Sequence, residues 1–193
     1  MTITVLERKG DSVISLKDAK AFLRITHDLE DELIRSSIQA ATEWVEDQTG
    51  KMLQEKKVSF VIPLNRKIRE RAGLFLRVWH SSGRSLFFFP IQPLIELTKV
   101  SLISMEGELQ EIPPQRIHLN MSKDPAFLML DEFVGWGFRF ECWVGYQDNS
   151  LVPGLLKQAV LQAMACFYED RNDTSTLYAK TAGLLTPFRH VGM

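Results

Sequence analysis

The first fifty residues carry apolar side chains at the period of an α-helix. Four of them recur at intervals of four, three and four: Ile34, Ile38, Ala41 and Val45. This spacing places them on one helical face, and Gly50 is a typical residue for the end of a helix. The pattern predicts a helix over residues 28–49. It also predicts a shorter helix over residues 16–24, capped by Ser15 and Asp18.

The middle of the chain changes to short apolar runs separated by prolines, glycines and acidic residues. The runs expected to form strands are 58–62, 85–89, 94–104, 109–112, 115–119, 126–130 and 137–146. Residues 105–108 predict a hairpin turn, and Gly135-Trp136-Gly137 predicts a turn that precedes a strand.

Helical spacing returns after Pro153, because proline suits the first turn of a helix. The pattern therefore predicts an α+β fold in which the N- and C-terminal helices, residues 15–50 and 153–189, pack together as a helical body. An antiparallel β region of short strands, about residues 56–147, is inserted between them. We expect a single domain over residues 1–193.

Composition excludes several classes of protein. The 193 residues contain 23 Lys and Arg against 24 Asp and Glu, a formal charge of −1, whereas a protein dedicated to neutralising DNA phosphates needs a cationic surplus. The sequence contains no run of about 18 apolar residues, so it predicts no membrane span.

No motif indicates catalysis, a metal or a cofactor. The four histidines are not spaced as metal ligands, and the glycine signatures of nucleotide-binding loops and of hydrolase nucleophiles do not occur. Cys142 and Cys166 lie 24 positions apart in apolar runs, where a free cysteine behaves as a small hydrophobic residue. We expect no catalytic residue, no metal, no cofactor and no enzymatic activity.

Two segments suggest contacts with partners. Four cations lie close together in a predicted loop: Arg66, Lys67, Arg69 and Arg71. This basic loop is either a solvated hairpin tip or a contact for nucleic acid or an acidic protein. Phe87, Phe88 and Phe89 follow one another in a predicted strand, so they point to both of its faces. Either the fold covers both faces, or a neighbouring subunit covers one of them.

The order of these motifs resembles the head-tail connector (adaptor) proteins of long-tailed phages and of phage-derived gene transfer agents. The segments that carry the resemblance are Ser15–Arg24, His27–Ile34, Ala40–Glu46, Thr49–Lys51, Phe89–Pro90, Pro93–Leu94, Val144–Tyr146, Val152–Pro153, Leu156–Val160, Phe167–Arg171 and Leu184–Arg189. They run through most of the chain in family order, and residues 62–84 diverge from the family.

The resemblance implies a structural protein of the virion neck. Connectors of this type form a ring, expected to be dodecameric, beneath the portal. The ring extends the DNA channel, lets DNA pass without specific binding, and receives the next neck or tail protein. Assembly would take place in the cytoplasm of the bacterial host. The resemblance also implies that the C-terminal segment contacts the portal, through Leu184, Leu185, Pro187, Phe188 and Arg189. The alternative is that its apolar residues pack on the core.

A closed ring requires two different complementary patches on each subunit. Phe87, Phe88 and Phe89 are candidates for one patch, and Glu43 and Glu46, facing the basic loop, are candidates for another. A second function remains open at this point, namely that of a DNA-contacting or enzymatic packaging protein.

Overall fold

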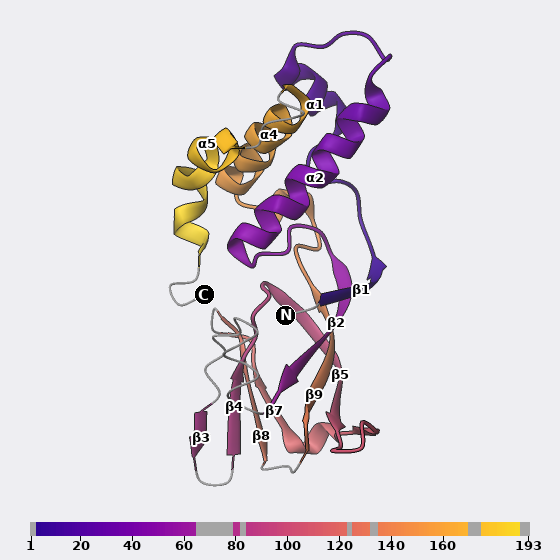
Figure 1. Ribbon diagram of the computed structural model, residues 1–193, viewed down its shortest axis with the longest axis vertical. Helices are drawn as coiled ribbons and strands as arrows, with labels where there is room; N and C mark the ends of the chain where they lie inside the picture. Colours follow the sequence, from indigo (N-terminus) through magenta and orange to yellow (C-terminus); the bar gives the residue numbers. More distant parts are fainter. Residues whose placement is uncertain are drawn as a thin grey trace. The chain divides into compact units, whose positions relative to one another are not determined.

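The computed structural model describes residues 3–64, 79–81, 84–122, 125–131, 135–169 and 175–189. Contacts along the chain divide it into two units (Figure 1). The β unit consists of Glu55–Gly145 together with the N-terminal strand, and the helical unit consists of Gly10–Gln54 and Tyr146–His190.

The larger sheet of the β unit is antiparallel, and its strand order is β1-β2-β9-β5-β6. Its strands are β1 (Ile3–Arg8), β2 (Lys56–Pro63), β5 (Leu94–Ile103), β6 (Leu109–Glu111) and β9 (Gly137–Val144). The central strand β9 pairs with β2 from Val144 opposite Lys56 to Gly137 opposite Pro63. A side chain at Gly137 would place its Cβ 2.7 Å from the Ile62 carbonyl oxygen, so this register needs a glycine.

The smaller sheet is also antiparallel, in the order β3-β4-β8-β7. Its strands are β3 (Trp79–Ser81), β4 (Arg84–Phe88), β7 (Ile117–Asn120) and β8 (Phe127–Asp131), and a short 3₁₀ turn, η1 (Pro114–Arg116), leads into β7.

Phenylalanine rings from the two sheets form the core of the β unit. Phe87 of β4 meets Phe138 of β9 at a centroid distance of 5.3 Å, and Phe60 of β2 stacks on Phe140 of β9 at 5.4 Å. Phe89 also contacts Phe140, at 5.8 Å. These rings are almost completely buried, so the aromatic layer joins the two sheets.

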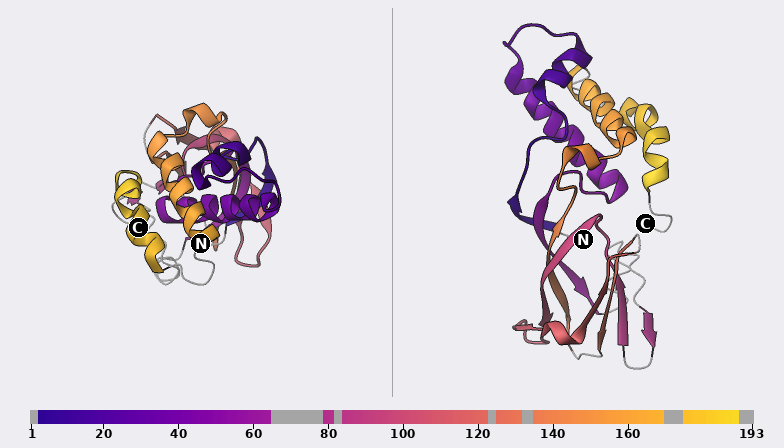
Figure 2. Two further views of the ribbon diagram at one scale, coloured as in Figure 1. Left: turned by 90° about the horizontal axis from the view of Figure 1, so that it is seen from above. Right: turned by 180° about the vertical axis from the view of Figure 1, so that it is seen from behind.

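The helical unit contains α1 (Leu16–Leu23), α2 (Asp31–Thr49), α4 (Gly154–Glu169) and α5 (Ser175–Leu185), with 3₁₀ turns η2 (Asn149–Leu151) and η3 (Thr186–Phe188). Helix α4 packs against both α2 and α5 (Figure 2). The apolar stripes of α2 and α4 supply most of its core, including Ile34, Ile38, Leu156 and Val160. No described helix is long and apolar enough to cross a membrane.

The ends of the helices follow ordinary capping chemistry. Ser15 Oγ accepts a hydrogen bond from the Asp18 backbone N–H at 3.1 Å, as the sequence predicted for α1. Gly50 has φ +67° and donates its N–H to the Glu46 carbonyl, which ends α2 where the sequence placed it. The N-terminus of α2 lies at Asp31, three residues later than predicted.

The predicted fold class is wrong. We expected helices at both ends of the chain and one inserted β region of short strands. Instead the chain begins with strand β1, which pairs with β2, and the described strands form two separate antiparallel sheets in which β5 is ten residues long. The physical reason is that β1 gains its hydrogen bonds from residues about fifty positions later. Apart from Ile3 its residues are exposed, so the local sequence contains no apolar pattern that predicts the strand.

Candidate functional site

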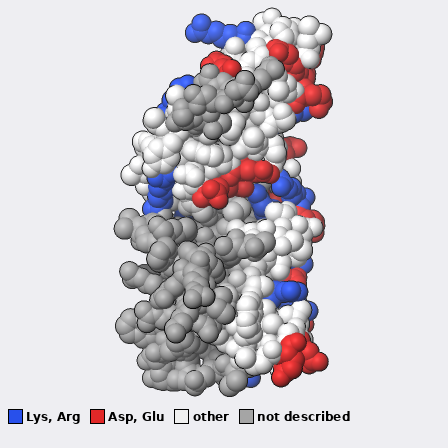
Figure 3. Space-filling model, in the orientation of Figure 1, with Lys and Arg blue, Asp and Glu red and all other residues white. Residues whose placement is uncertain are grey.

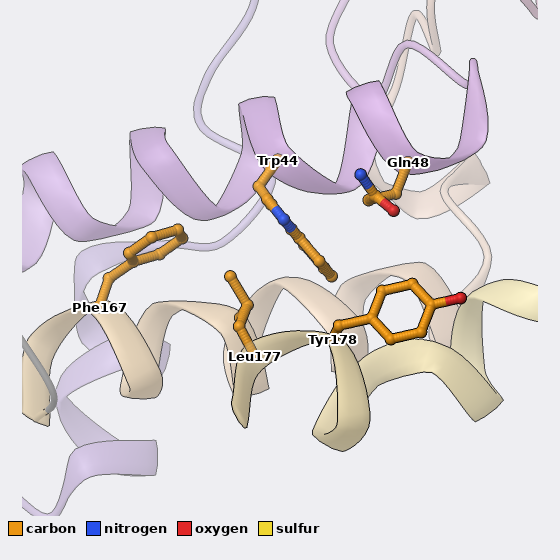
Figure 4. Close-up of a pocket in the computed structure, with 5 residues that line it drawn as sticks. All are labelled: Trp44, Gln48, Phe167, Leu177 and Tyr178. Atoms are coloured by element: carbon orange, nitrogen blue, oxygen red, sulfur yellow. The ribbon is translucent and has the colours of Figure 1, made fainter. Parts of the chain in front are cut away.

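A pocket opens in the helical unit among helices α2, α4 and α5 (Figure 4). Its volume is about 170 Å³, and its lining is mostly aromatic and aliphatic: Trp44, Gln48, Phe167, Leu177 and Tyr178. Trp44 and Gln48 lie one turn apart on α2, so both side chains face the same way. Leu177 is buried and forms the base, whereas the Tyr178 side chain is 53% exposed.

Arg189 supports one end of this pocket. Its Nη1 donates a hydrogen bond to Tyr178 Oη and its Nη2 donates one to Gln48 Oε1, both at 2.8 Å. The guanidinium carbon also lies 5.0 Å from the centre of the Tyr178 ring, a cation–π distance. The buried Arg189 Nε has no hydrogen-bond partner in the part of the chain that the structure describes. The pocket therefore combines an apolar lining with an unused donor beside it.

The other predicted portal-contacting residues divide by exposure. Leu185 is completely buried, Leu184 and Phe188 are half-buried against the core of the helical unit, and Pro187 is exposed. The segment thus packs on its own unit and also presents surface. Its contact with a portal stays a prediction.

The predicted subunit-interface residues also differ in exposure. Phe87 and Phe89 are buried in the β unit, so the fold itself covers that face of the strand, while Phe88 is half-buried and packs against Phe127 at 6.0 Å. On α2, Glu43 is exposed, whereas Glu46 is buried and accepts a hydrogen bond from the Leu53 N–H at 2.7 Å. Phe88 and Glu43 are the members of this set that present surface.

The predicted basic loop, Arg66, Lys67, Arg69 and Arg71, lies outside the described residues.

A second exposed feature lies where α1 turns into α2. The Lys20 ammonium group reaches Asp28 Oδ1 at 2.5 Å and Asp31 Oδ1 at 2.8 Å. The hydrogen bond to Asp28 is the largest cause of a raised pKa at Lys20, and the bond to Asp31 adds to it. The Lys20–Asp28 hydrogen bond also lowers the pKa of the Asp28 carboxyl. Tyr168 Oη donates to Glu30 Oε2 at 2.5 Å. Figure 3 shows carboxylates gathered at this end of the helical unit.

Between these bonded residues stands Leu29, whose side chain is 91% exposed. We call residues 28–30 the Leu29 turn. The sequence pattern did not indicate this leucine, because a single apolar residue in a polar turn has no periodic pattern. The sequence pattern did not indicate the pocket either, although the i, i+4 spacing of Trp44 and Gln48 places both side chains on one face of the helix.

No cluster of three His, Cys, Asp or Glu side chains that would hold a metal ion occurs within the described ranges. Both cysteines are buried, and burial raises the pKa of the Cys142 thiol to about 12, which keeps it protonated and unreactive.

Comparison with known proteins agrees with this picture. Residues 13–72 match the family model described as "Phage gp6-like head-tail connector protein". The predicted resemblance to phage head-tail connectors is confirmed. No curated protein matches the chain.

Three solved structures contain chains that share the fold of this protein over its whole length. They are a "Neck of empty GTA particle computed with C6 symmetry" (19% identity, TM-score 0.70), a "Virion of native gene transfer agent (GTA) particle" (16%, 0.71) and a "Neck of native GTA particle computed with C12 symmetry" (20%, 0.67). Each match covers 100% of this chain and 97% of the other. At these identities the likeness establishes the fold.

The connector family match covers α1, the Leu29 turn, α2 and β2. It therefore includes Trp44 and Gln48 of the pocket, but not α5 or Arg189, which complete the pocket from the other end of the chain. The family is described as a head-tail connector protein, and two of the three matched structures are necks of GTA particles.

Proposed function

We propose that this chain is a structural head-tail connector subunit, which assembles as a ring under the portal, extends the DNA channel and joins the capsid to the tail. The observation that carries the proposal is the coincidence of two matches. The family model of head-tail connectors covers residues 13–72, and the fold of the complete chain matches chains in gene-transfer-agent neck and particle structures.

The symmetry of the matched neck structures supports a ring, since two of them were computed with C6 and C12 symmetry. We infer a dodecamer on the portal, located in the neck of the particle after assembly in the host cytoplasm. Its partners are the portal protein on one side and a neck or tail protein on the other. The formal charge of −1 suits a channel through which DNA slides without specific binding. The subunit acts by assembly and not by catalysis.

The C-terminal segment is the proposed portal contact. Pro187 is exposed and its neighbours Leu184 and Phe188 are half-buried, so the segment offers apolar surface without unfolding. Leu185 is buried and Arg189 is bonded to α2 and α5, so both hold the segment in place. We expect Phe88 and Glu43 to contribute to contacts between subunits, because each keeps exposed surface.

The test is co-purification of the chain with the portal protein of the same genome, followed by electron microscopy of the complex. We expect a ring of connector subunits on the portal. Pro187→Asp should weaken portal binding while the isolated chain stays folded, and Lys17→Asp, an exposed change on α1, is the matched control.

A chain that stays monomeric and fails to bind the portal would contradict the proposal. A DNA-contacting packaging protein would instead retard non-specific DNA in a gel, and this binding would fall steeply as the salt concentration rises.

A further inference from the structure

The Leu29 turn presents an exposed apolar side chain between two residues that are held in place. Single exposed leucines are common on protein surfaces and do not by themselves indicate an interface. Here the residues on either side of Leu29 are bonded to other helices: Asp28 to Lys20 of α1, and Glu30 to Tyr168 of α4. A turn whose neighbouring residues are already held in place loses less conformational entropy when it enters a partner. The Leu29 turn is therefore suited to insert an apolar side chain into a pocket of a partner.

The pocket lined by Trp44, Leu177 and Tyr178 has the properties of the receiving half. Its volume of about 170 Å³ is similar to that of an apolar cavity of about 150 Å³ that accommodates benzene. A leucine side chain has four carbon atoms, fewer than benzene, so one leucine fits. The polar groups of the lining are the Trp44 indole N–H, the Gln48 amide and the Tyr178 hydroxyl. Gln48 Oε1 and Tyr178 Oη already accept hydrogen bonds from Arg189.

The α5 side of the pocket is complementary in charge to the Leu29 turn. Residues 28–32 carry four carboxylates: Asp28, Glu30, Asp31 and Glu32. Residues 175–189, which form the α5 side of the pocket, carry Lys180 and Arg189 and no carboxylate. The buried Arg189 Nε–H has no partner in the described part of the chain, so the guanidinium group keeps an unsatisfied donor on this side of the pocket. On α2, Glu43 directly precedes Trp44 and Asp47 directly precedes Gln48. One position is a rotation of about 100° around the helix, so these two carboxylates flank the pocket on the α2 side.

The turn of one chain cannot reach the pocket of the same chain. Leu29 precedes the N-terminus of α2 and Gln48 lies at its C-terminal end, and the 19 residues of this helix span about 28 Å. Figure 1 shows the α1–α2 connection at one end of α2 and α5 beside the other end. Two different patches that are held apart on one rigid element form a head-to-tail contact between copies.

We propose that Leu29 of one copy inserts into the pocket of Trp44, Gln48, Phe167, Leu177 and Tyr178 of the next copy, and that the acidic residues beside it meet Arg189 there. This contact between helical units repeats around the ring. The inference deepens the proposed function, because it rests on ring formation and names the surfaces that form it.

Assembly of single variants provides the first test. In the full-length chain, Leu29→Asp should raise the concentration needed for ring formation by about tenfold or more, as expected for a buried anchor. Tyr178→Asp should do the same, since it adds a negative charge to the pocket while leaving Arg189 a carboxylate partner. Leu151→Asp is the matched control, because Leu151 is 62% exposed on the same unit and has no place in this contact.

A disulfide trap provides the second test. The double variant Leu29→Cys/Tyr178→Cys, oxidised with copper phenanthroline after assembly, should give a ladder of linked subunits on a denaturing gel. Each single cysteine variant should give none, because the native Cys142 and Cys166 are buried. Thermal unfolding of every variant verifies that the chains are folded.

The outcomes separate the two proposals. If the wild-type chain assembles and Leu29→Asp assembles equally well, or if the double variant gives no ladder, the contact is overturned and the connector function stands. If Leu151→Asp impairs assembly as strongly as Leu29→Asp, the contact is also overturned, because any exposed leucine then suffices. If the wild-type chain forms no ring with or without the portal, both proposals fail.

Discussion

Arg189 Nη2 donates a 2.8 Å hydrogen bond to Gln48 Oε1, across 141 positions of the chain. This contact joins the end of the described chain to the C-terminal turn of α2, and the bond from Nη1 to Tyr178 adds α5. One guanidinium group therefore fixes two walls of the pocket and the position of the segment that we propose to contact the portal. Arginine suits this task because its planar group donates in several fixed directions.

Arg189→Ala should destabilise the helical unit by about 2 kcal/mol, the typical value for hydrogen bonds that involve a charged group. Urea denaturation followed by circular dichroism measures the change. Lys17→Ala, which removes an exposed cation from α1, should change the stability by less than about 0.5 kcal/mol. Equal stability of Arg189→Ala and the wild type would show that the two bonds do not hold the segment.

Phe140→Ala should destabilise the β unit by about 3–5 kcal/mol, because it leaves a cavity at the centre of the aromatic layer. The Phe140 ring is fully buried and contacts Phe60, Phe87 and Phe89. Phe88→Ala is the matched control, since Phe88 is half-buried and packs against Phe127 on the opposite face of the strand. Chemical denaturation should show a clearly smaller loss for Phe88→Ala, and similar losses would contradict the assigned core.

Local patterns predicted the helices of this chain well, and they failed where the contacts are distant. The spacing of Ile34, Ile38 and Ala41 reports the buried face of α2, and these residues are indeed core residues. Strand β1 was missed because its bonds come from β2. The later start of α2 has a similar cause, since residues 28–30 form a turn to which Lys20 is bonded from α1.

The candidate site shows the same limit. The tail was singled out by resemblance, but Arg189 was interpreted without Gln48, its partner 141 positions away. Glu46 was interpreted as a charged surface residue because glutamate is usually exposed. In the structure its carboxylate accepts the Leu53 N–H and is buried. Periodicity reports which face of a helix is buried, and it does not report which polar group completes a hydrogen bond there.

Ser15→Ala should destabilise the helical unit by about 1 kcal/mol, because the Asp18 N–H at the start of α1 loses its acceptor. Equilibrium unfolding in urea measures the loss. Ser36→Ala is the matched control, since the exposed Ser36 hydroxyl bonds to the Leu33 carbonyl within α2 and alanine favours a helix. A loss at Ser36 as large as that at Ser15 would argue against a specific cap.

The Cys142 thiol should not react with an aromatic disulfide reagent at pH 8 in the native protein, and it should react at once in guanidinium chloride. Burial is the cause, because it raises the pKa of this thiol from an ordinary 9.0 to about 12 and excludes the reagent. Rapid labelling of Cys142 under native conditions, identified by peptide mass, would contradict the buried position in β9.

The same shift makes the stability of the β unit depend on pH in one direction. Well below pH 9 the Cys142 thiol is protonated in both the folded and the unfolded chain, so it contributes no pH dependence there. As the pH rises from about 9 toward about 12, the unfolded chain releases the proton while the folded chain retains it. The free energy of unfolding then falls, by at most about 1.4 kcal/mol per pH unit. Urea denaturation at pH 8 and pH 10 measures this fall, and Cys142→Ala should reduce it by removing the thiol while other groups titrate as before. An equal fall in the variant would show that the thiol is not the group responsible.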